Sequence, residues 1–219
     1  FVVPAGLDPE GEIADHVRRH GDGIRHLAWQ VNDAVGAAEL AAVKGASVVT
    51  DPASVAGESG SVTTAAIAAY GETRILFVDR TDWHGGWGPG FTDDRLPRPP
   101  AGPAVGLSSI DHVVGNVEQG RLDDWVGWFG EVLGFRQMRH FDADQISTQY
   151  SALRSTVVHN GSGVVMPINE PAPGLRRSQI EEYLDSYRGP GVQHVALATP
   201  DIVTSVAAMQ QRGVRFLDM

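Results

Sequence analysis

The chain has 219 residues, of which 42% are hydrophobic and 20% charged, and its formal net charge is −10. This composition excludes a disordered chain, and the acidic balance argues against a protein that binds nucleic acid or an anionic membrane. Cysteine is absent, which excludes a disulfide framework, a thiolate metal site and a cysteine nucleophile. The absence of cysteine is compatible with a reducing cytoplasm, where we expect the protein. No apolar run approaches the length of a membrane span, about 20 residues.

The first predicted elements are a short strand at residues 1–3 and a helix at residues 13–20. His16 and His20 lie on a polar turn of this helix and are expected to face solvent. An apolar strand is expected at residues 24–31. An Asp N-cap then opens a helix of about three turns, which a glycine ends before a second strand begins.

This pattern occurs twice, because residues 21–50 align with residues 189–218 without a gap. His26 corresponds to His194, and the N-cap Asp33 corresponds to Asp201. The second copy therefore predicts a strand, a capped helix and a further strand at residues 214–219. A helix precedes each copy, at residues 13–20 and 178–187.

A proline-dense segment at residues 86–106 separates the two copies and cannot form a helix or a central strand. After it we expect a strand at residues 110–115 and a helix that carries Trp125, Trp128, Phe129 and Leu133 on one face and ends at Gly134. Three strands should follow, around residues 134–140, 148–159 and 163–166.

The order strand, helix, strand, strand, strand is a βαβββ unit that repeats along the chain. We therefore expect an α+β fold in which paired units form half-open barrels with a concave, ligand-holding face. The domains are expected to be an N-terminal half at residues 1–95, a Pro-rich linker at 96–108 and a C-terminal catalytic half at 109–219. We expect the chain to be a piece of a longer protein, cut at both ends.

Two histidines, His112 and His194, lie in the first strands of two units. Apolar residues two positions before and after each histidine share its face, so both imidazoles should point inward into one cavity. Each can be a hydrogen-bonded core residue, or the pair can bind a metal. Two histidines and one carboxylate suit a non-haem Fe(II) site, which then requires a third ligand.

His26 occupies the position of His194 in the first half, but the nearby strand at residues 74–78 offers no carboxylate. We therefore expect the first half to be metal-free, with His26 buried or hydrogen-bonded.

Several stretches resemble one known family: IDHVVGNV (110–117), YSALRSTVV (150–158), MPINEPAPG (166–174), SQIEEYLDSYRGPGVQHVAL (178–197) and GWGPGF (86–91). They are similar to bacterial 4-hydroxyphenylpyruvate dioxygenases, which belong to the vicinal oxygen chelate superfamily with its glyoxalase-like fold. The resemblance is closest over residues 109–219 and weaker over residues 1–95.

The resemblance implies one Fe(II) held by His112, His194 and a glutamate beyond Met219. It implies that 4-hydroxyphenylpyruvate, an α-keto acid, reacts with O2 to give homogentisate and CO2 in tyrosine catabolism. Separately from the resemblance, we expect a homo-oligomer with no nucleic-acid or membrane partner. The substrate contacts of the family correspond to Ser155, Asn169, Gln179 and Gln193.

Each of these polar residues has an ordinary alternative role. Asn169 can form a turn, Gln179 can be a solvated residue of a first helical turn, and Ser155 can bond a backbone group. Gln193 is adjacent to His194, so strict alternation turns it away from the metal unless the strand is irregular. Two alternative functions also remain: 4-hydroxymandelate synthesis from the same substrate, and non-enzymatic ligand binding on the same fold.

Overall fold

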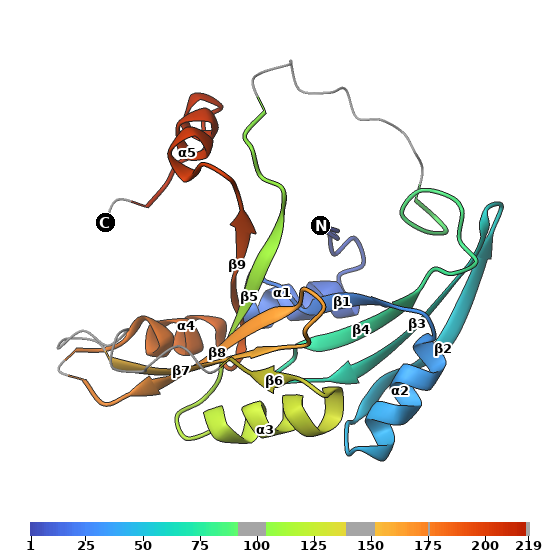
Figure 1. Cartoon of the computed structure of the whole chain (residues 1–219), viewed down its shortest axis with the longest axis horizontal. Helices are drawn as coiled ribbons and strands as arrows, with labels where there is room; N and C mark the ends of the chain where they lie inside the picture. Colours follow the sequence, from blue (N-terminus) through green and yellow to red (C-terminus); the bar gives the residue numbers. More distant parts are fainter. Residues whose placement is uncertain (92–103, 139–151, 175, 218–219) are drawn as a thin grey trace.

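The computed structural model describes residues 1–91, 104–138, 152–174 and 176–217, and it contains two β-sheets (Figure 1). The first sheet has the strand order β1-β4-β3-β2. Helix α2 packs against this sheet, mainly on β3. The elements of this unit are β1 (His26–Val31), α2 (Ala34–Val43), β2 (Val48–Gly57), β3 (Gly60–Ala68) and β4 (Arg74–Asp79).

The second sheet has the strand order β9-β5-β8-β7-β6. Strands β5, β8, β7 and β6 repeat the order of β1, β4, β3 and β2, and β9 is added beside β5. In both units the first and last strands pair in parallel, β1 with β4 and β5 with β8. The βαβββ repeat and the α+β fold class are therefore confirmed. The elements are β5 (Ser109–Asn116), α3 (Leu122–Leu133), β6 (Arg136–Gln137), β7 (Ala152–His159), β8 (Val165–Ala172) and β9 (Gly191–Ala198).

The three remaining helices are α1 (Glu12–His20), α4 (Gln179–Tyr187) and α5 (Ile202–Gln211). As predicted, Asp33 caps α2 and Asp201 caps α5, each accepting a hydrogen bond from a backbone N–H of the first turn. Gly134 ends α3 in the left-handed conformation, with a φ of 71° that a side chain would disfavour. Local capping chemistry thus fixes these helix ends.

Two predicted strands do not form. Residues 1–3 and 214–217 are both apolar and β-prone in sequence, but neither pairs with another strand. A strand needs a neighbour to satisfy its backbone hydrogen bonds, so composition alone does not produce one. Some predicted segments lie outside the described residues. These are the predicted strand residues 139–140, 148–151 and 218–219 and the linker residues 96–103.

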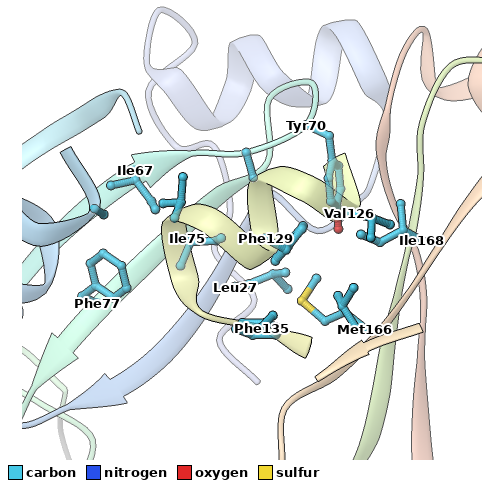
Figure 2. Packing of buried hydrophobic residues seen from close by; sticks show 14 of the residues in the cluster. Leu27, Ile67, Tyr70, Ile75, Phe77, Val126, Phe129, Phe135, Met166 and Ile168 are labelled. Atoms are coloured by element: carbon cyan, nitrogen blue, oxygen red, sulfur yellow. The ribbon is translucent and has the colours of Figure 1, made fainter. Parts of the chain in front are cut away.

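One hydrophobic core joins the two units (Figure 2). Trp29 of β1 stacks on Phe135 of the second unit at a centroid distance of 5.5 Å, and Tyr70 meets Trp125 edge-on at 5.7 Å. The predicted face of α3 packs on this core, with Phe129 fully buried and Trp125, Trp128 and Leu133 partly buried. The fully packed side chains of α3 are Leu122, Val126, Phe129 and Val132.

Within the described ranges, none of the helices has the length and apolar character needed to cross a membrane.

Candidate metal and substrate site

His112 and His194 come together on two adjacent antiparallel strands, β5 and β9. His112 lies opposite Ala196, and Val114 lies opposite His194. Because directly opposed residues share a face of the sheet, the two histidines are diagonal neighbours on the same face. Their ring centroids are 5.9 Å apart, with an angle of 71° between the ring planes.

The residue before each histidine bonds its ring. Asp111 Oδ2 lies 2.6 Å from Nδ1 of His112, and Gln193 Oε1 lies 2.9 Å from Nδ1 of His194. A carboxylate or amide oxygen accepts here, so both Nδ1 atoms donate, and in the neutral rings both Nε2 atoms carry the lone pair. Each imidazole is thereby held in the tautomer that a metal ion at Nε2 requires.

Strand irregularities make these adjacent contacts possible. The β5–β9 register shifts between Ile110 and His112, which leaves Asp111 unpaired, and shifts again so that Gln193 is unpaired. A bulged residue departs from strict alternation, so its side chain can reach the neighbour that alternation would place on the other face. The two bulges thus give both histidines the same kind of partner.

The imidazole rings of His112 and His194 are more exposed to solvent than their apolar neighbours in sequence predicted. His112 has 30% of its side chain exposed, and His194 is exposed. Val114 and Val192 are buried while Ile110 is half exposed, so the histidines lie where the strand pair leaves the core. Partial loss of water around the ring, and then the neighbouring His112, lower the pKa of His194.

Ser155 and Asn169 lie opposite each other on β7 and β8, and Asn169 in turn lies opposite Asn116 on β5. These three residues form a polar row on the face of β5 that carries His112. Asn169 and Asn116 are buried, and the Asn169 side-chain amide donates to the Asn116 carbonyl oxygen at 3.4 Å. The row is a set of neutral donors and acceptors suited to a polar organic ligand.

Gln179, by contrast, is the first residue of α4 and is exposed. Within the described part of the chain, no hydrogen bond joins it to any of the other five predicted site residues.

Sequence reasoning missed several polar residues. Asp111 and Asn116 had no distinguishing signal, because their roles depend on the bulge and on the strand order. His16 and His20 are not solvent-facing as predicted, since His16 is 5% exposed and the His20 side chain 8%. Their spacing on one helix was a usable signal for ligation. His26 is exposed, so its expected burial is wrong.

Comparison with known proteins places this geometry in a family. Residues 109–218 match the Glyoxalase/Bleomycin resistance protein/Dioxygenase superfamily. The chain is 43% identical to a 4-hydroxyphenylpyruvate dioxygenase of Dictyostelium discoideum, over 99% of this chain and 60% of that protein. It is 40% identical to the Aspergillus fumigatus protein of the same name, over 94% of this chain and 52% of that protein.

A solved structure with the same architecture is the S221M V223F Y359A mutant of 4-hydroxymandelate synthase from Streptomyces coelicolor. The TM-score is 0.76 at 27% identity, covering 97% of this chain and 60% of that one. The chain spans about half the length of the curated relatives it matches. The match to residues 109–218 covers half of the chain, which therefore belongs to the Glyoxalase/Bleomycin resistance protein/Dioxygenase superfamily.

Proposed function

We propose that this chain is part of an Fe(II)-dependent dioxygenase that converts 4-hydroxyphenylpyruvate and O2 to homogentisate and CO2. The observation that carries the proposal is the pair His112 and His194, with ring centroids 5.9 Å apart and both Nδ1 atoms already bonded. The identity of about 40% to proteins of that name supports the choice of substrate.

The donor set fits one iron ion. With metal–nitrogen bonds of about 2.1 Å, two imidazoles on a single ion have centroids about 6.4 Å apart when they are trans and about 4.6 Å apart when they are cis. The observed separation of 5.9 Å lies between these values, so the rings close by about 1 Å to reach the cis arrangement of a facial site. Two neutral imidazoles need one carboxylate to complete the facial triad of non-haem Fe(II) oxygenases. We propose that this third ligand is a glutamate beyond Met219.

When bound, iron supplies the activation of O2 that decarboxylation of the keto acid and hydroxylation of its ring require. The chain's own residues prepare for this by fixing the tautomers of the two histidines. Asp111 and Gln193 hold the imidazoles by their Nδ1 atoms, so that Nε2 of each neutral ring is left for the metal. The N-terminal half, residues 1–95, is proposed to take no part in binding this iron.

The polar row is proposed to orient the substrate. Asn169 donates to Asn116, which leaves its own carbonyl oxygen to accept a hydrogen bond from a phenol hydroxyl. Ser155, directly opposite on β7, can donate to a carboxylate or a phenol oxygen. Gln193 uses its oxygen on His194, and its amide N–H groups can donate to the substrate. We also propose a substrate contact for Gln179.

The test is a product analysis with the full-length protein. Incubation with 4-hydroxyphenylpyruvate, Fe(II) and air should give homogentisate, identified by mass spectrometry and NMR. His112→Ala and His194→Ala should each abolish turnover and weaken iron retention, since two remaining ligands do not fix a facial site. His26→Ala, the exposed equivalent of His194 in the first half, is the matched control and should retain turnover.

A second candidate is 4-hydroxymandelate synthesis from the same substrate, which the structural similarity to such a synthase favours. The two reactions can share the same histidines and differ in the carbon that is hydroxylated. Hydroxymandelate as the product of the same incubation would replace the first proposal with this one.

Ligand binding without catalysis makes a different prediction. A binding protein on this fold needs no metal, so His112→Ala should leave ligand affinity unchanged and the wild type should show no turnover. We further propose a homo-oligomer in the cytoplasm, which light scattering of the purified protein and fractionation of cells would test.

A further inference from the structure

A second cluster of ligating side chains lies away from the proposed iron site. His16 and His20 are four residues apart on α1, and Glu72 lies in the turn between β3 and β4. Glu72 Oε2 is 3.2 Å from Nδ1 of His16 and 3.3 Å from Nε2 of His20. Among the described residues, this is the one group of three such side chains whose ligand atoms all lie within 4.8 Å of one another.

The hydrogen bond of His20 directs its other ring nitrogen at Glu72. Its Nδ1 lies 2.5 Å from the backbone oxygen of Tyr187, which can only accept, so Nδ1 carries the hydrogen. In the neutral ring the Nε2 atom then holds a lone pair. Nε2 is buried and forms no hydrogen bond within the described chain, yet it faces a carboxylate oxygen of Glu72. A buried imidazole nitrogen and a carboxylate oxygen, both acceptors, are stabilised in contact by a cation between them, either a proton or a metal ion.

His16 is arranged in a matching way. Its Nε2 lies 3.3 Å from the hydroxyl of Tyr187, and its Nδ1 faces Glu72. When Nε2 donates to that hydroxyl, the lone pair of Nδ1 points toward the carboxylate. Tyr187 thus orients both imidazoles, one through its hydroxyl and one through its carbonyl.

The spacing of the ligand atoms suits a small divalent ion. Tetrahedral zinc with bonds of about 2.05 Å separates its ligand atoms by about 3.3 Å. The two nitrogen–oxygen distances, 3.2 and 3.3 Å, match that edge. Two imidazoles and one carboxylate are also a common zinc ligand set with one coordination position left open.

We infer that His16 Nδ1, His20 Nε2 and Glu72 Oε2 form a binding site for a divalent cation of the zinc class. The site would link α1, the β3–β4 turn and the end of α4, which belong to both halves of the chain. It is independent of the proposed iron site and differs from the expectation of a metal-free first half, which rested on His26.

Neighbouring groups can complete the coordination of the ion and balance the charge of Glu72. The other carboxylate oxygen of Glu72, Oε1, pairs with Arg19, which leaves Oε2 directed at the imidazoles. His20 and Glu72 also line a cavity of about 380 Å³, together with Arg188 and Pro190. A water or a small anion in this cavity can take the open coordination position.

The first test measures zinc binding in the absence of the proposed iron ligands. The 219-residue chain with His112→Ala and His194→Ala, freed of metal, is titrated with zinc against a chromophoric chelator. We expect one zinc per chain, and a loss of affinity of at least about tenfold when Glu72→Gln or His20→Gln is added. His26→Gln, an exposed histidine nearby in sequence, is the matched control and should leave zinc affinity unchanged.

Further measurements separate a loss of zinc ligands from a loss of folding. Circular dichroism of each variant establishes the fold, and the visible spectrum of the cobalt(II)-loaded chain should change with Glu72→Gln. Tyr187→Phe removes the hydroxyl partner of His16 but keeps the carbonyl partner of His20, so zinc affinity should fall about 10- to 100-fold.

The inference is overturned if the folded double variant binds no zinc, or if folded Glu72→Gln and His20→Gln bind it as well as their parent. The first result would mean that His20 is a protonated partner of Glu72. Since the histidines of the iron site are absent from this experiment, its outcome does not depend on whether the dioxygenase proposal holds.

Discussion

Asp111 immediately precedes His112, and its carboxylate holds the imidazole at Nδ1. Replacing it with alanine frees the ring to rotate and removes the acceptor that fixes the tautomer. We expect Asp111→Ala to lower iron affinity about 10- to 100-fold in the full-length protein, as for other partners of metal-bound histidines. Chelator competition with Fe(II) measures this directly.

Asp111→Asn is the matched control, because its amide oxygen can still accept from Nδ1. It should retain most of the iron affinity. Equal losses for Asp111→Ala and Asp111→Asn would contradict a hydrogen-bonding role and would point instead to the negative charge of Asp111.

At this scale, the sequence indicated His112 and His194 because both open equivalent strands of a repeat. The periodicity of a strand does not reveal a bulge, so the contact of Gln193 with His194 could only be framed as a conditional expectation. The burial of His20 could not be predicted from the sequence for a similar reason. It depends on Tyr187, 167 residues further along the chain, which no local pattern connects to α1.

Glu170 connects two elements of the second unit. It is 2% exposed on β8, and its Oε2 accepts from the backbone N–H of Leu122, the first residue of α3, at 3.0 Å. Glu170→Ala leaves this buried N–H without an acceptor, so we expect the free energy of unfolding to fall by about 2–3 kcal/mol. Urea denaturation of the variants measures the change.

Two controls separate the contributions of Glu170. Its ion-pair partner Arg154 is half exposed, but without it the buried carboxylate of Glu170 loses its counter-ion, so Arg154→Ala should cost more than the about 1 kcal/mol of an exposed pair and less than Glu170→Ala. Glu170→Gln keeps an acceptor for Leu122 and should lie between the two. A loss for Arg154→Ala as large as that for Glu170→Ala would argue that the ion pair is the dominant contact.

The capping box of α4 should make stability depend on pH. The hydrogen bonds from Ser178 to Glu181 lower the pKa of that carboxyl in the folded state. A lowered folded pKa means that the stabilisation is present above the ordinary glutamate pKa and is lost as pH falls through the folded value. Glu181→Gln keeps the box without the titration.

Urea denaturation of wild type and Glu181→Gln across the acidic range tests this. The stability difference between the two proteins should be largest near neutral pH and should vanish in acid. A difference that stays constant with pH would show that the carboxylate charge of Glu181 adds nothing to the cap.

At the scale of elements, helices were the more predictable part of the fold. Asp33, Asp201 and Ser178 each cap a helix through contacts within three residues, which the sequence displays directly. Strands were less predictable, because residues 1–3 and 214–217 have strand-like composition without a pairing partner. The pairing of β9 with β5 is likewise a property of the assembled sheet.

The contact between the two units can be probed at Tyr70. This side chain is fully buried, its hydroxyl forms no hydrogen bond within the described residues, and burial raises the pKa of the phenol. Removing an unpartnered buried hydroxyl relieves a desolvation cost. We therefore expect Tyr70→Phe to raise the free energy of unfolding by about 1 kcal/mol.

Gly115→Ala tests the same contact from the other unit. A Cβ atom at Gly115 would lie 2.4 Å from the Tyr70 hydroxyl oxygen, so we expect a loss of about 1–3 kcal/mol from overpacking. Both values come from urea denaturation. A large loss for Tyr70→Phe would contradict this account and imply an ordered water bonded to the hydroxyl.

The shared core has a consequence for dividing the molecule. Trp29 and Tyr70 from the first unit pack against Phe135 and Trp125 from the second, so each unit alone would present this aromatic surface to water. The chain can be produced as two polypeptides, one ending and one starting within the proline-dense segment. Each alone should aggregate and be poorly soluble. Mixed together, they should recombine into a complementing pair, in the manner of a split protein.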